Sequence, residues 1–286
     1  MTAMTRHQLH DDDHDDFGGL HRDLLATGAA MDRRGILRLA ARFGMSAGAL
    51  SLLGCGGSSS PTSPSGTDTG TGTTTGTGAC TAKIPSETAG PYPGDGSNGP
   101  NVLGLTGVVR SDIRSSFAGL SGTADGVQLT LVLTLVSSST CAPLAGQAVY
   151  LWHCDRPGRY SLYSSGATNQ NYLRGVQAAD AAGVVTFTTI FPGCYAGRWP
   201  HIHFEVYPSL SSATSVGNKV ATSQIALPKT ACDEVYALAG YESSVTNLSR
   251  VSLATDNVFS NGSALELATV TGSAAAGMTA ALTVAV

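Results

Sequence analysis

The sequence predicts an all-β protein: a β-sandwich with long loops and one or two short helices, preceded by a disordered export signal and linker. Two observations favour this class. From Cys80 onward, short runs of β-branched and aromatic residues alternate with turn residues. The chain also combines 35 glycines with only 13 % charged residues, which is typical of a turn-rich globular protein with few long surface helices.

Six segments have the length and composition of strands, and each is bounded by Gly, Pro, Asn, Asp or Ser. They span residues 127–136, 147–154, 183–190, 201–207, 219–227 and 281–286. Residues 232–240 predict a helix, because Val235, Leu238 and Ala239 recur at helical spacing, with Gly240 as its C-terminal cap. We find no internal repeat and no Gly-rich phosphate loop, which excludes the usual nucleotide-binding folds.

Residues 1–55 are interpreted as an export signal. Paired arginines, Arg33 and Arg34, precede a moderately apolar stretch that is too short and too rich in Gly and Ala to cross a bilayer. The pattern resembles a twin-arginine (Tat) signal, and its ending "LLGC" resembles a bacterial lipobox, with Cys55 as the lipidated residue. The alternative is an amphipathic helix of the domain itself. We therefore expect an exported protein in the cell envelope or on the extracellular face, held to a membrane only through a lipid anchor at Cys55.

Residues 56–79 predict a flexible linker, because a stretch rich in Gly, Ser and Thr cannot bury enough apolar surface to fold. The globular domain is then expected over residues 80–286. The acidic run 11–16, "DDDHDD", is interpreted as solvated rather than metal-binding. The net charge is −4 and the positive charges cluster only in the signal, which argues against nucleic acid as a partner.

Two histidines share one face of the predicted strand 201–207. His201 and His203 are two residues apart in a segment of period two, so both imidazoles leave the same face. Ile202, Phe204 and Val206 then point the opposite way, into apolar packing. The strand therefore predicts a pair of aligned nitrogen ligands.

Two tyrosines on turns extend this pair to a metal-binding set. Turn residues bracket Tyr195, just upstream of Arg198, and a second turn, "PGRYSLY" at 157–163, presents Tyr160. A highly charged cation lowers the pKa of a phenol that coordinates it. Two imidazoles and two phenolates suit ferric iron, whereas structural zinc would prefer thiolates and magnesium would prefer carboxylates and water.

Four blocks of the chain together resemble the intradiol ring-cleavage dioxygenases, the relatives of protocatechuate and catechol dioxygenases. The blocks are "ETAGPYP" (87–93), "LWHCDRPGRYSLY" (151–163), "FPGCYAGRWPHIHFEVY" (191–207) and "TSQIALP" (222–228), in the family's order. The resemblance implies a β-sandwich that holds a non-haem Fe(III) through Tyr160, Tyr195, His201 and His203. It also implies that O2 is used to cleave a catechol-type ring between its two hydroxylated carbons, giving a muconate-type diacid.

The resemblance implies further site residues. Tyr195 would be displaced by the catechol and accept a substrate proton. Arg198 matches an arginine whose fixed positive charge stabilises the anionic ring, and Gln224 matches a glutamine at the back of the site. The family's N-terminal block, which borders the substrate pocket, matches Gly90, Pro91 and Tyr92.

Two other functions stay open at this point. One is a lipid-tethered β-sandwich binding module, in which the histidines and tyrosines line a sugar or peptide site. The other is a zinc-dependent hydrolase, for which Glu205 is the one nearby acid or base. Glu205 is otherwise expected to orient a histidine or to lie on an exposed strand position. His153 is interpreted as a core histidine with satisfied hydrogen bonds.

Five cysteines follow the lipobox, in a compartment where disulfides persist, and none has CxxC spacing. Cys154 and Cys194 each lie close in sequence to a candidate ligand tyrosine, so we expect a disulfide between them. A second pair, Cys141 with Cys232, would leave Cys80 over.

Overall fold

The computed structural model describes residues 81–286. The predicted export signal (1–55), the linker (56–79) and the acidic run (11–16) lie outside the described residues, as do Cys55 and Cys80. These interpretations stay predictions.

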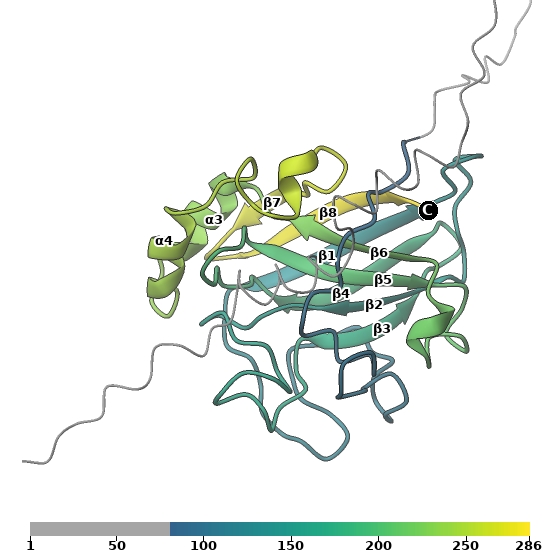
Figure 1. The fold of residues 1–286 in the computed structure, drawn as a ribbon, viewed down its shortest axis with the longest axis horizontal. Coiled ribbons are helices and arrows are strands. Elements are labelled where there is room, and N and C mark those ends of the chain that lie inside the picture. The colour runs from purple at the N-terminus through teal and green to yellow at the C-terminus, as the bar shows by residue number, and fades with distance from the viewer. Residues whose placement is uncertain (1–80) are drawn as a thin grey trace, which may run out of the picture. The chain divides into compact units, whose positions relative to one another are not determined.

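Two four-stranded sheets form the body of the domain, with strand orders β4-β1-β8-β7 and β3-β2-β5-β6 (Figure 1). The first sheet contains β1 (Gln128–Val136), β4 (Val184–Ile190), β7 (Thr269–Ser273) and β8 (Gly277–Ala285). The second contains β2 (Ala148–Trp152), β3 (Arg174–Ala178), β5 (His201–Tyr207) and β6 (Ala221–Ala226). All neighbouring strands are antiparallel except β1 and β8, which are parallel. The predicted β-sandwich is confirmed.

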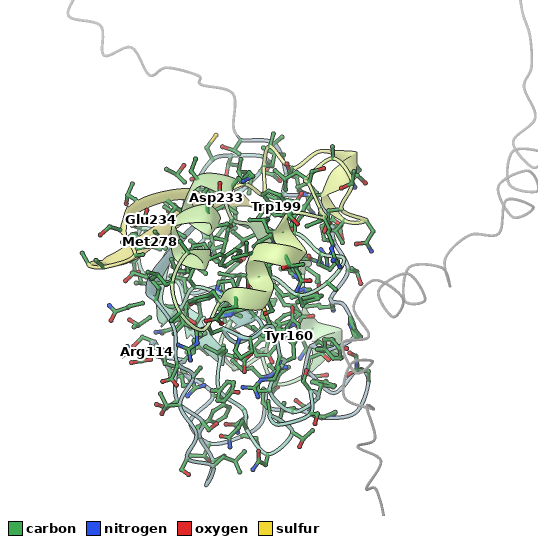
Figure 2. All side chains as sticks on the ribbon, turned by 90° about the vertical axis from the view of Figure 1, so that its left-hand side faces the viewer. Arg114, Tyr160, Trp199, Asp233, Glu234 and Met278 are labelled. Atoms are coloured by element: carbon green, nitrogen blue, oxygen red, sulfur yellow. The ribbon has the colours of Figure 1, made fainter. Side chains whose placement is uncertain are left out.

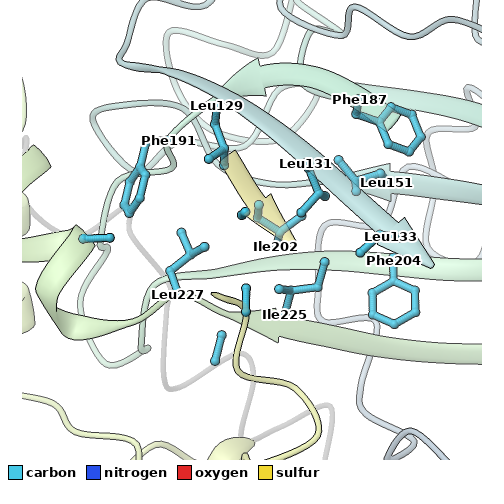
Figure 3. Packing of buried hydrophobic residues seen from close by; sticks show 14 of the residues in the cluster. Leu129, Leu131, Leu133, Leu151, Phe187, Phe191, Ile202, Phe204, Ile225 and Leu227 are labelled. Carbon is cyan, nitrogen blue, oxygen red and sulfur yellow. The ribbon is translucent and has the colours of Figure 1, made fainter. Parts of the chain in front are cut away.

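The core lies between the two sheets (Figure 3). In β1, every second residue is fully buried, because the pleat sends alternate side chains to the same face. Leu129, Leu131 and Leu133 thereby meet Ile202 and Phe204 of the opposite sheet. Complete burial of such a side chain contributes about 1.5–3 kcal/mol, so this face fixes the register of β5.

The strand boundaries follow the predicted segments where the apolar alternation is strong. β1, β4 and β5 agree with the prediction to within one residue, and β8 begins four residues earlier than expected. The prediction missed β3 and β7. β3 ("RGVQA") has little apolar alternation, and β7 ("TVTGS") is a mostly exposed edge strand with a glycine near its end.

Two short helices pack at one end of the sandwich (Figure 1). α3 (Lys229–Tyr236) begins three residues before the predicted helix, and its C-cap is Ala237, so the expected cap at Gly240 is wrong. Gly240, at φ +92°, instead lies in the connection to α4 (Glu242–Leu248), which was not predicted. The 3-10 turns η1 (Val216–Asn218) and η2 (Phe259–Asn261) complete the elements. Within residues 81–286, no helix combines the length and hydropathy that a membrane crossing needs.

A buried carboxyl lies beside β6. Glu266 is fully buried and accepts a hydrogen bond from the Ser223 hydroxyl at 3.3 Å through Oε1, while its Oε2 has no hydrogen-bond partner among the described residues. Burial, and next the negative charge of Glu87, raise the pKa of Glu266 to about 8.

Replacing Glu266 by glutamine is expected to stabilise the domain more above pH 8 than below pH 4.5. Between these values the unfolded chain releases a proton that the folded domain retains. The contribution of this carboxyl to stability is therefore complete below pH 4.5 and lost as the pH rises through about 8. The expected gain at high pH is about 1–3 kcal/mol, the usual cost of an unsatisfied buried polar group. Urea unfolding of both proteins at the two pH values measures it, and an equal effect at both would contradict the prediction.

Candidate active site

Strand β5 aims both histidines at one point. It is a central strand, with Trp152 of β2 and Gln224 of β6 as the register partners of His203 on either side. Ile202 lies in the inter-sheet core, so His201 and His203 leave the opposite face of the strand, as predicted. The indole of Trp152 stacks on the imidazole of His203 at 4.9 Å and 5°, which fixes the plane of that ring.

Two packed turns present the tyrosines. The carbonyl of Asp155 accepts hydrogen bonds from the amides of Gly158 (2.9 Å) and Gly193 (3.1 Å), which joins the turn before Tyr160 to the turn before Tyr195. A Cβ at Gly193 would lie 2.3 Å from the carbonyl oxygen of Arg156, so only glycine permits this backbone contact. The two phenol rings consequently meet edge to face at 5.8 Å.

The four predicted donor atoms converge on His201. Its Nε2 lies 3.4 Å from Tyr160 Oη, 3.3 Å from Tyr195 Oη and 3.1 Å from His203 Nε2. The exposed fractions are 1 % for Tyr160, 7 % for Tyr195 and 2 % for each histidine. Figure 2 marks Tyr160, together with Trp199, within the body of the domain. The structure thus brings together the four side chains that the sequence assigned to one site.

Three polar atoms crowd a single acceptor, His201 Nε2. His201 Nδ1 lies 2.5 Å from the carbonyl oxygen of Trp199, which can only accept, so Nδ1 carries the proton and Nε2 presents a lone pair. Burial, with Arg198 as a further cause, lowers the pKa of His201 well below its usual value, and burial does the same for His203. Both rings are therefore neutral. One lone pair cannot accept from three neighbours at once, whereas a cation can be shared by all four donors.

The chemistry of the donor set fits a hard, highly charged cation. Burial, and next the neighbouring Tyr195, raise the pKa of Tyr160 well above its usual value, so this phenol ionises only beside a strong positive charge. In the described part of the chain, no group of three or more His, Cys, Asp or Glu side chains is arranged to hold a metal. The convergent set consists of two imidazoles and two phenols, which suits ferric iron.

Arg198 and Gln224 lie together beside the donors. Arg198 Nη2 donates to Gln224 Oε1 at 2.7 Å, and Gln224 Nε2 donates to the carbonyl of Thr88 at 2.9 Å. The polypeptide continues from Thr88 through Gly90 and Pro91 to Tyr92, whose ring lies 4.9 Å from that of Tyr160. The N-terminal block therefore borders the donor set, in agreement with the sequence.

Sequence reasoning missed Asp256, the counter-ion of Arg198. Both side chains are fully buried, and Arg198 Nε donates to Asp256 Oδ2 at 3.0 Å. Asp256 also accepts from the backbone amides of Trp199 (2.7 Å), Val258 (2.9 Å) and Phe259 (3.0 Å). The guanidinium of Arg198 is thus held in a fixed direction and paired with a buried carboxylate, while its expected role toward a bound ring stays a prediction. No pattern around Asp256 in the sequence marks it as a functional residue.

Glu205 has neither of its expected roles. It is fully buried and accepts from Lys219 Nζ and from Tyr207 Oη, each at 2.7 Å. It is therefore neither exposed nor hydrogen-bonded to a histidine, and its ion pair engages the carboxylate that a zinc hydrolase would need as a base. His153, by contrast, is confirmed as a satisfied core histidine, with Nδ1 on the carbonyl of Cys154 (2.8 Å) and Nε2 on Thr189 Oγ1 (2.7 Å).

The predicted cysteine pairs are wrong. Cys154, Cys194 and Cys232 are buried free thiols. Cys154 and Cys194 point their sulfurs at the carbonyls of Gly193 (3.3 Å) and Arg198 (3.4 Å), so proximity in sequence to the two tyrosines does not bring the sulfurs together in a bond. Cys141 is disulfide-bonded, and its partner is none of the three free thiols.

Alkylation of the denatured, unreduced protein is expected to label Cys154, Cys194 and Cys232 but not Cys141. In the native protein the three thiols should resist the reagent, because burial raises the pKa of Cys194 to about 12 and also raises the pKa values of the other two. Peptide mass mapping before and after denaturation measures both states. A peptide cross-linked through Cys154 and Cys194 would contradict the structure.

Comparison with known proteins identifies the fold around this site. Residues 112–213, which contain all four donors and Arg198, match the sequence profile of a family described as Dioxygenase. An intradiol ring-cleavage dioxygenase from Tetranychus urticae is similar in structure, with 24 % identity, a TM-score of 0.58, and coverage of 72 % of this chain and 94 % of that one. This part of the chain is therefore similar to dioxygenases, and the described domain shares the fold of an intradiol ring-cleavage dioxygenase. A second crystal structure of a dioxygenase is 25 % identical, with a TM-score of 0.57 over the same shares of the two chains. No curated protein sequence matches the chain.

The matched range does not cover the whole candidate site. Gln224 and Asp256 lie beyond residue 213, and Tyr92 lies before residue 112. The hydrogen bonds of Arg198 connect two of these outlying residues to the matched range. The candidate site therefore extends beyond the matched range on both sides.

Proposed function

We propose that the protein uses Fe(III) and O2 to cleave catechol-type rings between the two hydroxylated carbons, giving muconate-type diacids in the catabolism of aromatic compounds. The observation that carries this proposal is the convergence of two phenols and a second imidazole on the single lone pair of His201 Nε2, at 3.1–3.4 Å. A shared cation would relieve that arrangement, and the similarity of residues 112–213 to a family described as Dioxygenase supports ring cleavage as its use.

Three of the four donors would bind the iron throughout the reaction, and the fourth would accept a proton from the substrate. Tyr160, His201 and His203 would hold the iron, and the iron would supply the electron-accepting character that activates a chelated catechol toward O2. Tyr195 is the most exposed of the four donors, at 7 %, and would give way to the catechol while its Oη takes up a hydroxyl proton. One carbon–carbon bond breaks and both atoms of O2 enter the product, so each cleaved carbon ends as a carboxyl group.

Arg198 would orient the bound ring. Its guanidinium is fixed by Asp256 on one side and Gln224 on the other, so a donor group is held in place before substrate arrives. Because Asp256 balances its charge, Arg198 contributes direction rather than net attraction. Gln224 in turn ties this group to the Thr88 carbonyl, close to the segment that carries Tyr92.

Colour, metal content and product test the proposal together. Purified protein should contain about one iron per chain and absorb visible light through ferric phenolate. It should consume O2 with a catechol and place both atoms of labelled O2 in the diacid.

Tyr160→Phe should shift or remove the absorption, whereas Tyr241→Phe should not. Tyr241 is an equally buried tyrosine whose hydroxyl is hydrogen-bonded to the backbone of Val127 and Phe191. Colourless protein with zinc would favour the hydrolase, and colourless protein that binds a sugar or peptide without metal would favour the binding module.

We further propose that the enzyme is exported and tethered to a membrane through a lipid on Cys55. The twin-arginine pattern and lipobox support this, and so does the disulfide at Cys141, since disulfides persist in oxidising compartments. Cys55→Ser should move the protein from the membrane fraction to the soluble fraction while preserving its absorption. A protein that fractionates identically with and without Cys55 would overturn the anchor.

A further inference from the structure

A buried guanidinium without a carboxylate lies near the donor set. Arg174, the first residue of β3, is 1 % exposed. Its Nε donates to Ser161 Oγ at 3.0 Å, and its Nη2 donates to the carbonyls of Tyr92 and Ser161, both at 2.9 Å. Its Nη1 donates to the carbonyl of Pro93 at 2.7 Å and to Tyr150 Oη at 3.2 Å. Every acceptor is a neutral oxygen.

These acceptors belong to two segments that flank Tyr160. Ser161 is the residue after it, and Tyr92 places its ring against that of Tyr160 at 4.9 Å. Arg174 therefore holds the backbone of both neighbours of this phenol. A third contact comes from Tyr163, whose ring lies 5.5 Å from the guanidinium carbon and whose hydroxyl accepts from the Gly94 amide at 2.9 Å.

The 92–94 segment is shaped around the guanidinium. Gly94 has φ +65°, and a Cβ added there would lie 2.7 Å from Arg174 Nη1. Any side chain at this position would therefore displace either the loop or the guanidinium. Arg174 supplies the hydrogen-bond donors, and Gly94 has no side chain that would occupy the space of the guanidinium.

A charge buried against neutral oxygens is costly unless its hydrogen bonds are made, and a planar fork of five donors is what these dispersed acceptors require. An apolar side chain would fill the same space without that cost, but it would leave the carbonyls of Tyr92 and Ser161 without donors, whereas the Pro93 carbonyl would keep the hydrogen bond from Tyr150 Oη at 2.7 Å. Only arginine can donate hydrogen bonds to both segments at once, and it thereby fixes the position of the 92–94 segment against the Tyr160 turn.

We infer that Arg174 is a positioning residue that locks the Tyr92–Gly94 segment onto the Tyr160 turn and so sets the substrate-facing wall beside this donor. This positioning by Arg174 concerns the protein alone and does not depend on iron or substrate. Its consequence for catechol binding rests on the proposed function.

The experiment compares Arg174→Lys and Arg174→Met with Arg110→Met as the matched control. The Arg110 guanidinium also donates to backbone carbonyls, those of Ile113, Ser115 and Arg174, but it has no hydrogen bond to the 92–94 segment or to the Tyr160 turn. Gly94→Ala disturbs the same lock from the loop side, which keeps the test decisive if an Arg174 variant fails to fold.

Hydrogen exchange of metal-free protein is the first readout. The Gly94 amide should exchange about tenfold faster in folded Arg174→Lys and in Gly94→Ala, as the loss of a charge-assisted hydrogen bond allows, and at the wild-type rate in Arg110→Met. The peptide covering residues 91–103 reports this amide. Unchanged exchange of this peptide in folded Arg174→Lys would overturn the inference, whether or not the protein binds iron.

Spectra and kinetics of the iron-loaded protein are the second readout. The visible band should shift in Arg174→Lys, because the orientation of Tyr160 changes. KM for a catechol should rise by about tenfold or more, with a smaller fall in kcat. Arg110→Met should keep the wild-type band and KM. If wild-type protein binds no iron while the exchange result holds, the proposed function fails and the lock stands. If the band and KM do not change while exchange accelerates, the consequence for substrate is wrong.

Discussion

Replacing His201 by glutamine is expected to yield colourless protein with no bound iron and no measurable ring cleavage. His201 Nε2 is the atom on which the other three donors converge, and its lone pair is fixed by the bond from Nδ1 to the Trp199 carbonyl. Loss of an outer partner of a metal ligand already lowers metal affinity about 10–100-fold, so loss of this ligand should lower it by more. Elemental analysis, visible absorption and O2 uptake measure the result.

His153→Gln is the matched control for this substitution. His153 is as buried as His201, but it is bonded to Thr189 and the Cys154 carbonyl rather than to the donor set. We expect some loss of stability and an unchanged ratio of iron to protein. Iron retained in His201→Gln, or lost equally from both variants, would show that the donor set is not the metal site.

The sequence could predict the donor set because each part of it is local. His201 and His203 are aligned by the period of one strand, and that strand's opposite face is anchored by strongly apolar residues such as Ile202 and Phe204. Tyr160 and Tyr195 each follow a turn with Pro and Gly. β3 was not predicted, because its apolar alternation is weak. It forms a strand through its pairing with β2, which lies elsewhere in the chain.

The residues that hold the site were not predictable in the same way. Asp256 pairs with Arg198 across 58 residues, and Arg174 reaches Tyr92 across 82 residues, so no spacing rule connects them to the donors. The cysteine prediction failed on a related point. Cys154 and Cys194 do flank the two tyrosines, but the direction of each sulfur is set by a backbone carbonyl that accepts from it.

Asp256→Asn is expected to destabilise the domain by about 3–5 kcal/mol, the range found when one partner of a buried ion pair is removed. The change leaves the charge of Arg198 uncompensated at a fully buried position. Both carboxylate oxygens of Asp256 accept hydrogen bonds: Oδ1 from two backbone amides, and Oδ2 from Arg198 and the Trp199 amide. In asparagine, the side-chain NH2 would replace one of these oxygens and would face donors. Neither orientation of asparagine satisfies both sets. Urea unfolding measures the loss, and kcat should fall with it because Arg198 loses its fixed direction.

Asp233→Asn provides the comparison, because it removes an ion pair of similar N–O distance that lies at the surface instead of in the interior. Lys229 and Asp233 also form an ion pair, at 2.7 Å, but their side chains are 63 % and 52 % exposed, so its loss should cost no more than about 1 kcal/mol. The double variant Arg198→Met, Asp256→Asn separates the pair from its surroundings. If the unpaired charge dominates, adding Arg198→Met should recover part of the stability lost in Asp256→Asn. Equal costs for Asp256→Asn and Asp233→Asn would mean that the buried pair contributes nothing beyond an exposed one, and that Arg198 is held by its other contacts.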